Sequence, residues 1–366
     1  MSLQQLSYRS NGYDLLNIDQ CIESLSKMIK HNNNLFNNKT QFIKQAGLSI
    51  KFLGKGGQGI AYLLQSDKCG SVVIKISKIN DETKNEIFFL NSVKNTVDKN
   101  ICPHFVYNYE NKILSNNYYF FDEYANGTLE NWTEDEHSVE EWNSFLFQIL
   151  YGIYVFQKKL KSFHADLKPK NILFKRIQKG FFKYIIENNE YYVPTCGYLF
   201  IISDFGKSQS ILKNNNVMDN ESILAHIKNN TDLENIEALP KRILVSAIEK
   251  KFSGSLVEFK KYVDQKNDDK FESYFLSEKR KIDVELSKYP DYIKNKMLLR
   301  SIIYYAIEKK YINVDNIEHN FFKMKYPPSI IVAKMENLLK KSINEQISNF
   351  LFYSERKTDI LAEFKI

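Results

Sequence analysis

Phe163-His164-Ala165-Asp166-Leu167-Lys168-Pro169-Lys170-Asn171-Ile172-Leu173 form a polar segment between a long amphipathic pattern and a short apolar run. Phosphoryl transfer needs a carboxylate that orients the attacking hydroxyl, a cation that neutralises the moving group, and a side-chain oxygen that holds a metal. Asp166, Lys168 and Asn171 offer these groups in that order. A simple Asp-Pro-Asn turn beside a buried His is the competing interpretation of so short a motif. The rest of the sequence is needed to distinguish a phosphoryl-transfer segment from a simple turn.

A glycine-rich segment, Gly54-Lys55-Gly56-Gly57-Gln58-Gly59, lies between two β-rich runs at 48–53 and 60–64. The G-x-G-x-x-G spacing alone also fits a hairpin turn. In a dinucleotide site the glycines lead into a helix, whereas here the chain continues as a strand. Glycines between two strands suit a loop over ATP phosphates, because backbone N–H groups can approach the phosphates without side-chain obstruction.

The next apolar run, Val72-Val73-Ile74-Lys75, ends in a lysine. A lysine at a strand end is usually solvated, but after a glycine loop Lys75 is predicted to hold the α- and β-phosphates. Residues 81–97 have a helical pattern, and Glu86 lies on a face that can turn inward. We expect Glu86 to pair with Lys75; Glu82 is the competing candidate, and a surface pair between Glu86 and a neighbouring lysine is the alternative.

Two more strand patterns, at 104–109 and 118–124, lead to Glu123-Tyr124-Ala125-Asn126-Gly127. This segment resembles the hinge of protein kinases, whose backbone groups contact the adenine edge; an ordinary strand-to-turn transition is the alternative. Either Phe121 or Asp122 is expected at the back of the nucleotide pocket.

A capping box at Ser138-Val139-Glu140-Glu141 begins a long helical pattern that leads to the Asp166 segment. After it, the runs 181–186 and 191–194, separated by turn residues, predict an inserted β-hairpin. The strand 198–203 then ends in Asp204-Phe205-Gly206, where Asp204 is a candidate metal ligand.

Four helical patterns follow, at 233–252, 256–263, 292–312 and 329–351. Residues 1–47 hold one more, at 18–29, and are interpreted as an extension that packs on the main fold or trails from it.

Composition excludes several classes of protein. A formal net charge of +7 over 366 residues is mild, and no dense Lys/Arg block marks a nucleic-acid site. No apolar run reaches the ~18–20 residues of a membrane span, and the N-terminus lacks the apolar core of a signal peptide. Cys21, Cys69, Cys102 and Cys196 are scattered, which favours free thiols in a reducing compartment. We therefore expect a cytoplasmic protein without a membrane span.

In chain order, these motifs resemble those of eukaryotic-type protein kinases: the glycine loop, V-A-I-K, H-R-D-x-K-x-x-N and D-F-G. Ala165 stands where the family usually has Arg, Val73 replaces Ala, and Ala61 replaces the usual Val. The resemblance covers residues 48–206; no A-P-E follows. The hairpin before D-F-G also resembles protein kinases of large nucleocytoplasmic DNA viruses.

The resemblance implies an α+β, bilobal fold with ATP in the cleft. It implies an N-terminal extension at 1–47, a β-rich N-lobe at 48–125 and a mostly α-helical C-lobe at 126–366, divergent after 206. If the enzyme is viral, its location would be the host cytoplasm or the virion.

The resemblance also implies ATP and Mg²⁺ as cofactors and Ser/Thr hydroxyls of protein substrates as acceptors. The catalytic residues would be Asp166, Lys168, Lys75 and Glu86, and the metal ligands Asn171 and Asp204. The nucleotide-binding residues would be Leu53, Gly54, Lys55, Gly56, Gly57, Gln58, Gly59, Ile60, Ala61, Val73, Lys75 and Glu123.

Three alternatives stay open. A small-molecule phosphotransferase of the aminoglycoside or choline kinase type shares H-x-D-x-x-x-x-N, and the missing A-P-E keeps this interpretation alive. A catalytically silent pseudokinase scaffold is the second, although retention of Lys75, Asp166, Asn171 and Asp204 argues against it. A sugar or lipid kinase with a similar core is the third.

Overall fold

The computed structural model describes residues 8–9, 16–31, 48–56, 59–66, 70–210, 245, 248–249, 252–287, 290–312, 334 and 343–366. Gly57, Gln58 and Cys69 lie outside these residues, as do most of the helical patterns predicted at 233–252 and 329–351.

The chain divides into two compact units. The first comprises Met1–Leu129, Glu140–Asn235 and Asn337–Ile366, and the second Glu130–Val139 and Ile236–Glu336. The first unit contains both the glycine-loop sheet and the segment around Asp166, so the lobe boundary predicted at 125/126 falls inside it. The division into 1–47, 48–125 and 126–366 stays a proposal about lobes.

Five antiparallel strands form the first sheet, in the order β1-β2-β3-β5-β4. Their bounds are β1 Leu48–Lys55, β2 Gly59–Ser66, β3 Gly70–Lys78, β4 Asn108–Leu114 and β5 Asn117–Glu123. β4 begins later than the strand predicted at 104–109, because Phe105 instead bridges Ile202 in another part of the unit.

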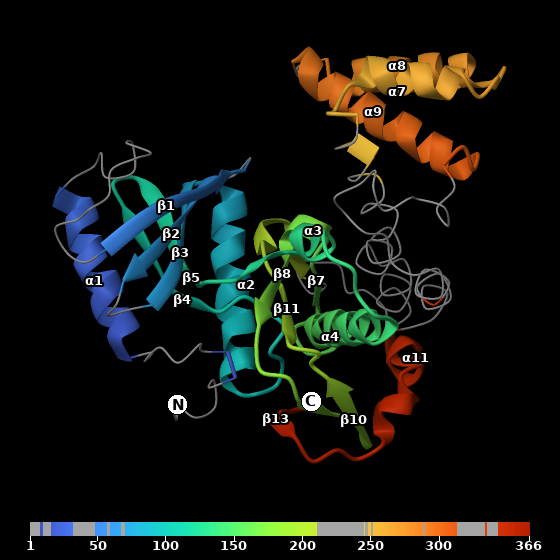
Figure 1. Cartoon of the computed structure of the whole chain (residues 1–366). Helices are drawn as coiled ribbons and strands as arrows, with labels where there is room; N and C mark the ends of the chain where they lie inside the picture. The colour runs from blue at the N-terminus through green and yellow to red at the C-terminus, as the bar shows by residue number, and fades with distance from the viewer. Residues whose placement is uncertain are drawn as a thin grey trace, which may run out of the picture. The chain divides into compact units, whose positions relative to one another are not determined.

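The two faces of this sheet have different partners, because side chains alternate along a strand. On β3, Val72 and Ile74 join an apolar cluster with the helix α1 (Leu16–His31), whose apolar stripe faces the sheet. Lys75 reaches from the other face to Glu86 of α2 (Asp81–Asp98). Figure 1 shows α1 and α2 on opposite sides of the sheet. The predicted helix 18–29 is confirmed, and it packs on the sheet.

A reciprocal cap sets the start of α2. The Asn80 side chain accepts a hydrogen bond from the Thr83 N–H at 2.8 Å, and the Thr83 hydroxyl accepts one from the Asn80 N–H at 3.0 Å. Because the cap fixes the first turn, it also fixes the rotation of the helix that brings Glu86 inward.

The remainder of the first unit mixes short strands with one long helix. Its elements are β6 Gly127–Thr128, α4 Val139–Lys158, β7 Ser162–Phe163, η3 Pro169–Asn171, β8 Ile172–Arg176, β9 Phe181–Ile186, β10 Asn189–Pro194, β11 Tyr198–Ile202, η4 Phe205–Lys207 and β12 Gln209–Ser210. The short helix α3 spans Leu129–Trp132, and all of it except Leu129 belongs to the second unit. β11, β8 and β6 pair in one sheet, and β12 pairs with β7. α4 is buried along almost its whole length and leads to the Asp166 segment, as its apolar pattern predicts.

The predicted hairpin before Asp204 is confirmed as β9 and β10, which pair antiparallel. His104 connects this hairpin to β11. Its Nδ1 lies 2.8 Å from the Phe200 carbonyl, and its Nε2 lies 2.8 Å from the hydroxyl of Tyr184 on β9. The carbonyl can only accept, so Nδ1 carries the proton and the Tyr184 hydroxyl donates to Nε2. Burial lowers the pKa of His104 to about 3, which keeps this neutral form.

The C-terminal end of the chain adds a strand that the sequence pattern did not indicate. β13 (Ile360–Lys365) pairs parallel with β9 and completes a three-stranded sheet with the hairpin. Two short helices, α11 (Ile343–Ser348) and η5 (Leu351–Ser354), precede it; α11 falls within the helical pattern at 329–351, most of which lies outside the described residues. The inserted hairpin is therefore built into the first unit through the chain's own C-terminus.

The second unit is helical where it is described. α7 (Leu256–Asp264) and α9 (Asp291–Glu308) confirm the patterns at 256–263 and 292–312, while α8 (Phe271–Glu285) was not predicted. An apolar cluster that includes Phe259, Phe271 and Ile302 joins the three helices. The fold is α+β, as the sequence indicates.

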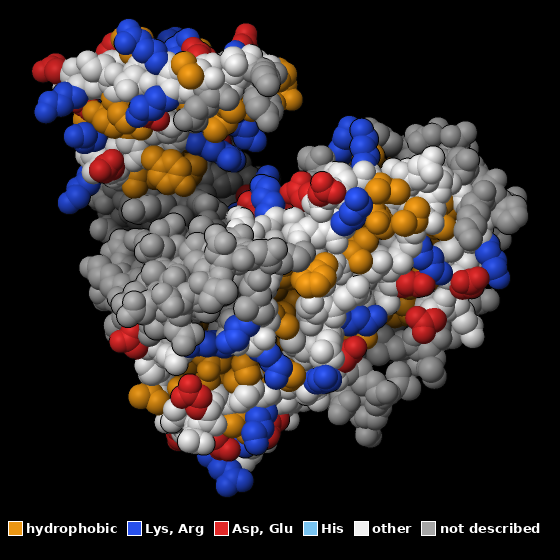
Figure 2. Space-filling view, turned by 180° about the vertical axis from the view of Figure 1, so that it is seen from behind, with side chains coloured by type: hydrophobic (Ala, Val, Ile, Leu, Met, Phe, Trp, Pro, Cys, Tyr) orange, Lys and Arg blue, Asp and Glu red, His pale blue; other side chains and the backbone are white. Residues whose placement is uncertain are grey.

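Two further expectations can be compared with the described residues. Cys102 and Cys196 are free thiols, but Cys21 is disulfide-bonded, so the expectation of free thiols is wrong for Cys21. Sequence spacing cannot show which cysteines the fold brings together. No described helix is both long and apolar enough to span a membrane. On the face in Figure 2, basic side chains are interspersed with acidic and apolar ones.

Candidate active site

The glycine loop joins the antiparallel strands β1 and β2. A Cβ at Gly59 would lie 2.3 Å from the Ile76 carbonyl oxygen, so no side chain fits there. A Cβ at Gly54 or Gly56 would meet nothing within 4 Å. Packing therefore requires glycine only at Gly59, whereas glycine at the other two positions leaves open space beside the backbone. Gly57 and Gln58 lie outside the described residues.

The predicted pair of Lys75 and Glu86 is formed. The Lys75 ammonium donates to both Glu86 carboxylate oxygens, at 2.6 and 2.9 Å, and lies 3.5 Å from Oδ1 of Asp204. Burial by itself would lower the pKa of Lys75, but the Glu86 and Asp204 carboxylates outweigh it and raise that pKa. Lys75 is thus a fixed cation, and Glu82 is not its partner in this arrangement.

Asn85, which sequence analysis did not single out, links α2 to the segment after Asp204. Its Nδ2 donates to the Gly206 carbonyl at 2.9 Å and to the Ser208 carbonyl at 2.8 Å. Phe205 is fully buried and stacks on Phe156 of α4. Asp204 itself has φ 67° and ψ 69°, a left-handed conformation that non-glycine residues rarely adopt. These contacts hold its carboxylate beside Lys75.

The Asp166 segment is held by its histidine. Nε2 of His164 lies 3.0 Å from the Ser203 carbonyl, and its Nδ1 accepts from the Asp166 N–H at 3.3 Å, so the proton is on Nε2. The next residue, Ala165, has φ 61°. His164 therefore links two segments. One is the turn that carries Asp166, and the other is the end of the strand that leads to Asp204.

Two lysines and an asparagine surround the Asp166 carboxylate. Lys168 Nζ lies 2.6 Å and Lys207 Nζ 3.5 Å from its Oδ2, and Asn171 Nδ2 donates to this Oδ2 at 3.4 Å and to the Asp166 backbone carbonyl at 2.9 Å. Burial would raise the pKa of Asp166, but Lys168 and then Lys207 outweigh it and lower that pKa. Asp166 is therefore ionised near neutral pH. Lys207 was not predicted; its position directly after D-F-G was the available signal.

Asn171 and Asp204 are brought together across two strands. The Ser203 N–H donates to the Asn171 carbonyl at 2.9 Å, so the residue before Asp204 lies directly beside Asn171. Amide and carboxylate oxygens are the ligands that Mg²⁺ prefers, and such sites commonly use one or two carboxylates together with substrate phosphates. The donor set of Asn171 and Asp204 fits that ion.

The sheet register identifies the residue at the back of the pocket. Phe120 and Asp122 of β5 oppose Lys75 and Val73 of β3 and share their face, whereas Phe121 lies in the α1 cluster. Asp122, not Phe121, therefore faces the candidate nucleotide pocket. Asn108 donates to its Oδ1 at 2.7 Å.

Glu123, predicted to contact the nucleotide, lies on the opposite face from Asp122. Its buried carboxylate is occupied by Arg9 and Lys175, with Lys175 Nζ at 2.9 Å. The Glu123 side chain is therefore turned away from the candidate nucleotide pocket, and the prediction that Glu123 contacts the nucleotide is limited to its backbone carbonyl. Arg9 was not found by sequence analysis, because nothing in the pattern relates residues 114 positions apart.

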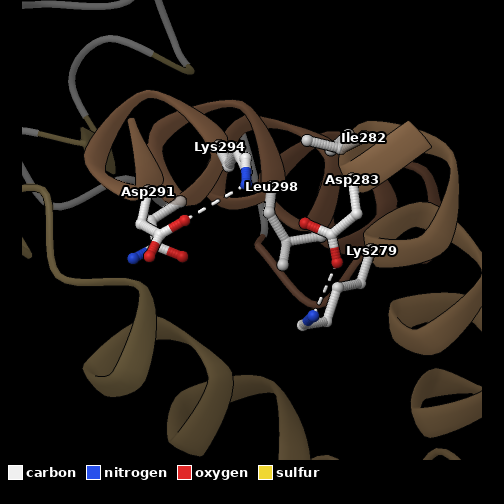
Figure 3. Close-up of a pocket in the computed structure, with 7 residues that line it drawn as sticks. Lys279, Ile282, Asp283, Asp291, Lys294 and Leu298 are labelled. Atoms are coloured by element: carbon white, nitrogen blue, oxygen red, sulfur yellow. Dashed lines mark hydrogen bonds and ion pairs between the residues drawn. The ribbon is translucent and has the colours of Figure 1, made fainter. Parts of the chain in front are cut away.

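The second unit has a cavity of its own, of about 240 Å³, between α8 and α9. Figure 3 shows its charged side chains paired within their helices, Lys279 with Asp283 at 2.7 Å and Lys294 with Asp291 at 3.2 Å. None of the residues predicted from the sequence lines it.

Asp122 makes stability depend on pH in a testable way. Burial is the main cause that raises its pKa from 3.8 to about 7; Asn108 opposes the shift and Glu86 adds to it. Between these values the folded protein holds a proton that the unfolded chain releases. The resulting stabilisation is present at low pH and is lost as the pH rises toward 7.

The substitution Asp122→Asn removes this titration and keeps an acceptor for Asn108. We expect the free energy of unfolding of the variant, relative to wild type, to increase by about 2 kcal/mol between pH 5 and pH 8, measured by urea denaturation. The fully exposed Asp81 provides the control, since Asp81→Asn should show no such increase. A difference for Asp122→Asn that does not change with pH would contradict the assignment.

Comparison with known proteins supports the same family. Residues 48–225 match the model of the protein kinase domain. A probable serine/threonine-protein kinase of Invertebrate iridescent virus 6 is 26% identical over 197 residues, which cover 44% of this chain and 36% of the viral protein. A probable serine/threonine-protein kinase of Dictyostelium discoideum is 34% identical over 109 residues, 27% of this chain and 9% of that protein.

An uncharacterised protein of the same iridescent virus is 42% identical over 72 residues, 19% of this chain and 12% of the viral protein. The chain thus spans about a third or less of the length of these three relatives. The family match covers the glycine loop, the Lys75–Glu86 pair, the Asp166 segment and Asp204, which the fold assembles in one unit. Over residues 48–225 the chain is a protein kinase domain of the eukaryotic type, and it is similar to the probable serine/threonine-protein kinase of Invertebrate iridescent virus 6.

Proposed function

We propose that this protein transfers the γ-phosphoryl group of ATP, with Mg²⁺, to Ser or Thr hydroxyls of protein substrates. The observation that carries the proposal is the position of Lys75 between the carboxylates of Glu86 and Asp204, at 2.6 and 3.5 Å. This arrangement joins the cation for the phosphates to a carboxylate that can hold the metal. Glu86 is buried and Lys75 is only 21% exposed, so their charges are costly to take out of water, and keeping them in this geometry favours a working phosphate site over a silent scaffold.

The residues have separate roles in the proposed reaction. The glycine loop would cover the phosphates with backbone N–H groups, and Lys75, oriented by Glu86, would bind the α- and β-phosphates. Asn171 and Asp204 would hold Mg²⁺, which when bound neutralises charge on the phosphate oxygens. Ala61 and Val73, neighbours on the cleft face of β2 and β3, would pack against the adenine.

Asp166 would orient the acceptor hydroxyl and accept its proton. Its lowered pKa supports positioning of the hydroxyl more than strong basicity, because a carboxylate with a low pKa is a weak base. Lys168, which contacts Asp166 at 2.6 Å, would move to the transferring phosphoryl group once substrate is bound.

The choice of a Ser or Thr acceptor rests on Lys168. Asp166-Leu167-Lys168-Pro169 has the form found in Ser/Thr kinases, and an aliphatic hydroxyl is a poor nucleophile that benefits from a nearby ammonium. A cytoplasmic location stays a prediction: the free thiols of Cys102 and Cys196 fit it, whereas the disulfide of Cys21 does not.

The substitution Asp166→Asn tests the reaction. It keeps the shape of the side chain but removes the carboxylate, so the transfer rate should fall by ~10²–10⁴. Transfer is measured with radiolabelled ATP and generic acidic and basic protein substrates beside small alcohols. Nucleotide affinity and the unfolding midpoint should change little, which separates a catalytic effect from misfolding. Unaltered turnover in the folded variant would exclude Asp166 from the mechanism.

Phosphoamino-acid analysis of the labelled products tests the acceptor. We expect phosphoserine and phosphothreonine, with no label on the small alcohols. Phosphotyrosine as the main product would overturn the Ser/Thr assignment. Label on the alcohols alone would instead establish the small-molecule phosphotransferase.

The contacts of Asn85 suggest that the active arrangement does not depend on phosphorylation. Many kinases use the Arg before the catalytic Asp to bind a phosphorylated loop, and Ala165 cannot do so. We expect phosphatase-treated enzyme to keep most of its activity. The substitution Asn85→Ala removes two hydrogen bonds of roughly 1 kcal/mol each, so kcat should fall by up to about thirtyfold.

Asn91→Ala, at an exposed position of the same helix, is the matched control and should keep wild-type kcat. Loss of activity on phosphatase treatment would show that a phosphorylated group, not Asn85, holds the segment after Asp204. Equal activity of the Asn85 and Asn91 variants would show that the Asn85 hydrogen bonds are not needed for the active arrangement.

A further inference from the structure

We propose that Arg9, from the N-terminal extension, is a positioning residue of the nucleotide site, acting through the buried carboxylate of Glu123. The proposal rests on the kinase activity proposed above. Sequence motifs assign no role to residue 9, which lies 39 positions before the first residue of the family match at 48.

Arg9 makes a buried and specific set of contacts. Its guanidinium donates to the carbonyl oxygens of Pro103 and Phe105, the latter at 2.8 Å, and to Oε1 of Glu123. Arg9 and Glu123 are only 4% and 3% exposed, and Lys175, which contacts the other oxygen of Glu123 at 2.9 Å, is 7% exposed. Buried ions are stable only when they are paired and hydrogen-bonded, so this network needs all of its members in place.

Glu123 is the last residue of β5 and directly precedes the segment 124–126 that would contact the adenine edge. Its own N–H donates to the Tyr107 carbonyl at 2.9 Å, and its Oε1 accepts from the Tyr107 N–H at 2.8 Å. Arg9 and Lys175 therefore hold the end of β5 from the side opposite the cleft. Burial would raise the pKa of Glu123, but Arg9 and Lys175 outweigh it and lower the pKa to about 2, so the carboxylate stays ionised.

A second set of contacts fixes Arg9 itself. The neighbouring Tyr8 packs edge-on against Phe182 of the inserted hairpin, at 5.6 Å between ring centroids, and against Phe364 of β13, at 5.8 Å. The hairpin, the C-terminal strand and the N-terminal extension thus meet around one aromatic ring. This packing gives the Arg9 side chain a rigid base from which to reach Glu123.

Loss of Arg9 should affect nucleotide binding more than chemistry. The loop at Phe105 stays attached to β11 without Arg9, because the Val106 N–H donates to the Ile202 carbonyl at 3.0 Å and the Ile202 N–H to the His104 carbonyl at 2.8 Å. The strand that leads to Asp204 is therefore still held. The end of β5, in contrast, loses one of its two cationic partners.

The test uses full-length Arg9→Met and Arg9→Lys variants. Methionine fills similar volume but leaves the two carbonyl groups without a donor; lysine keeps the charge but cannot reach three acceptors at once. For Arg9→Met we expect the KM for ATP to rise about tenfold while kcat falls less than threefold, with a matching loss of affinity for a fluorescent ADP analogue. Arg9→Lys should lie between Arg9→Met and wild type.

Arg300→Met is the matched control, because Arg300 also pairs with a carboxylate, Glu249 at 2.8 Å, in the second unit. It should leave the KM for ATP unchanged. If Arg9→Met melts at a lower temperature but keeps the wild-type KM and ADP affinity, Arg9 only stabilises the fold and the inference is wrong. If Arg9→Met does not fold, an unchanged KM in Arg9→Lys contradicts the inference equally. A wild-type protein that binds no nucleotide and transfers no phosphate would instead refute the proposed function.

Discussion

The ion pair between Lys75 and Glu86 is the interaction on which the rest of the candidate site depends. The Glu86 carboxylate is buried and the Lys75 ammonium is half-buried; removing such charges from water is costly, and only good geometry with further partners compensates that cost. The two hydrogen bonds between them, at 2.6 and 2.9 Å, require that β3 and α2 are both correctly placed. Alternation along β3 turns Lys75 away from the α1 cluster, and the cap at Asn80 sets the rotation of α2.

Contacts from this pair and its neighbours also position the segment that follows β11. Asp204 lies 3.5 Å from Lys75, and the side chain next to Glu86, Asn85, holds the carbonyls of Gly206 and Ser208. Phe205 is then buried against α4, the helix that leads to the Asp166 segment. A shift of α2 would therefore also shift Asp204. These contacts connect the first sheet of the kinase domain to its candidate metal ligands.

The segments outside the family motifs are integrated into this core. The inserted hairpin contributes Tyr184 to the His104 hydrogen bonds, the C-terminal strand β13 pairs with the hairpin, and Tyr8 packs on both. Burying these aromatic rings together stabilises the region behind β5. The described parts of the extension, the hairpin and the C-terminal strand therefore belong to the domain's structure, and Arg9 links them to Glu123 at the end of β5.

The sequence by itself determined the family, the α+β class, the strand at 72–76 that ends near Lys75, the helix of Glu86, the hairpin and the order of the candidate site residues. These features depend on local signals: alternation, helical periodicity, glycine spacing and turn residues. The tertiary structure alone decided that Asp122 faces the pocket while Glu123 faces Arg9, that Cys21 is disulfide-bonded, and that β13 joins the hairpin. The reason is physical: strand register and contacts between distant segments depend on packing of the whole chain, and no local pattern around residues 9, 123 or 364 encodes their partners.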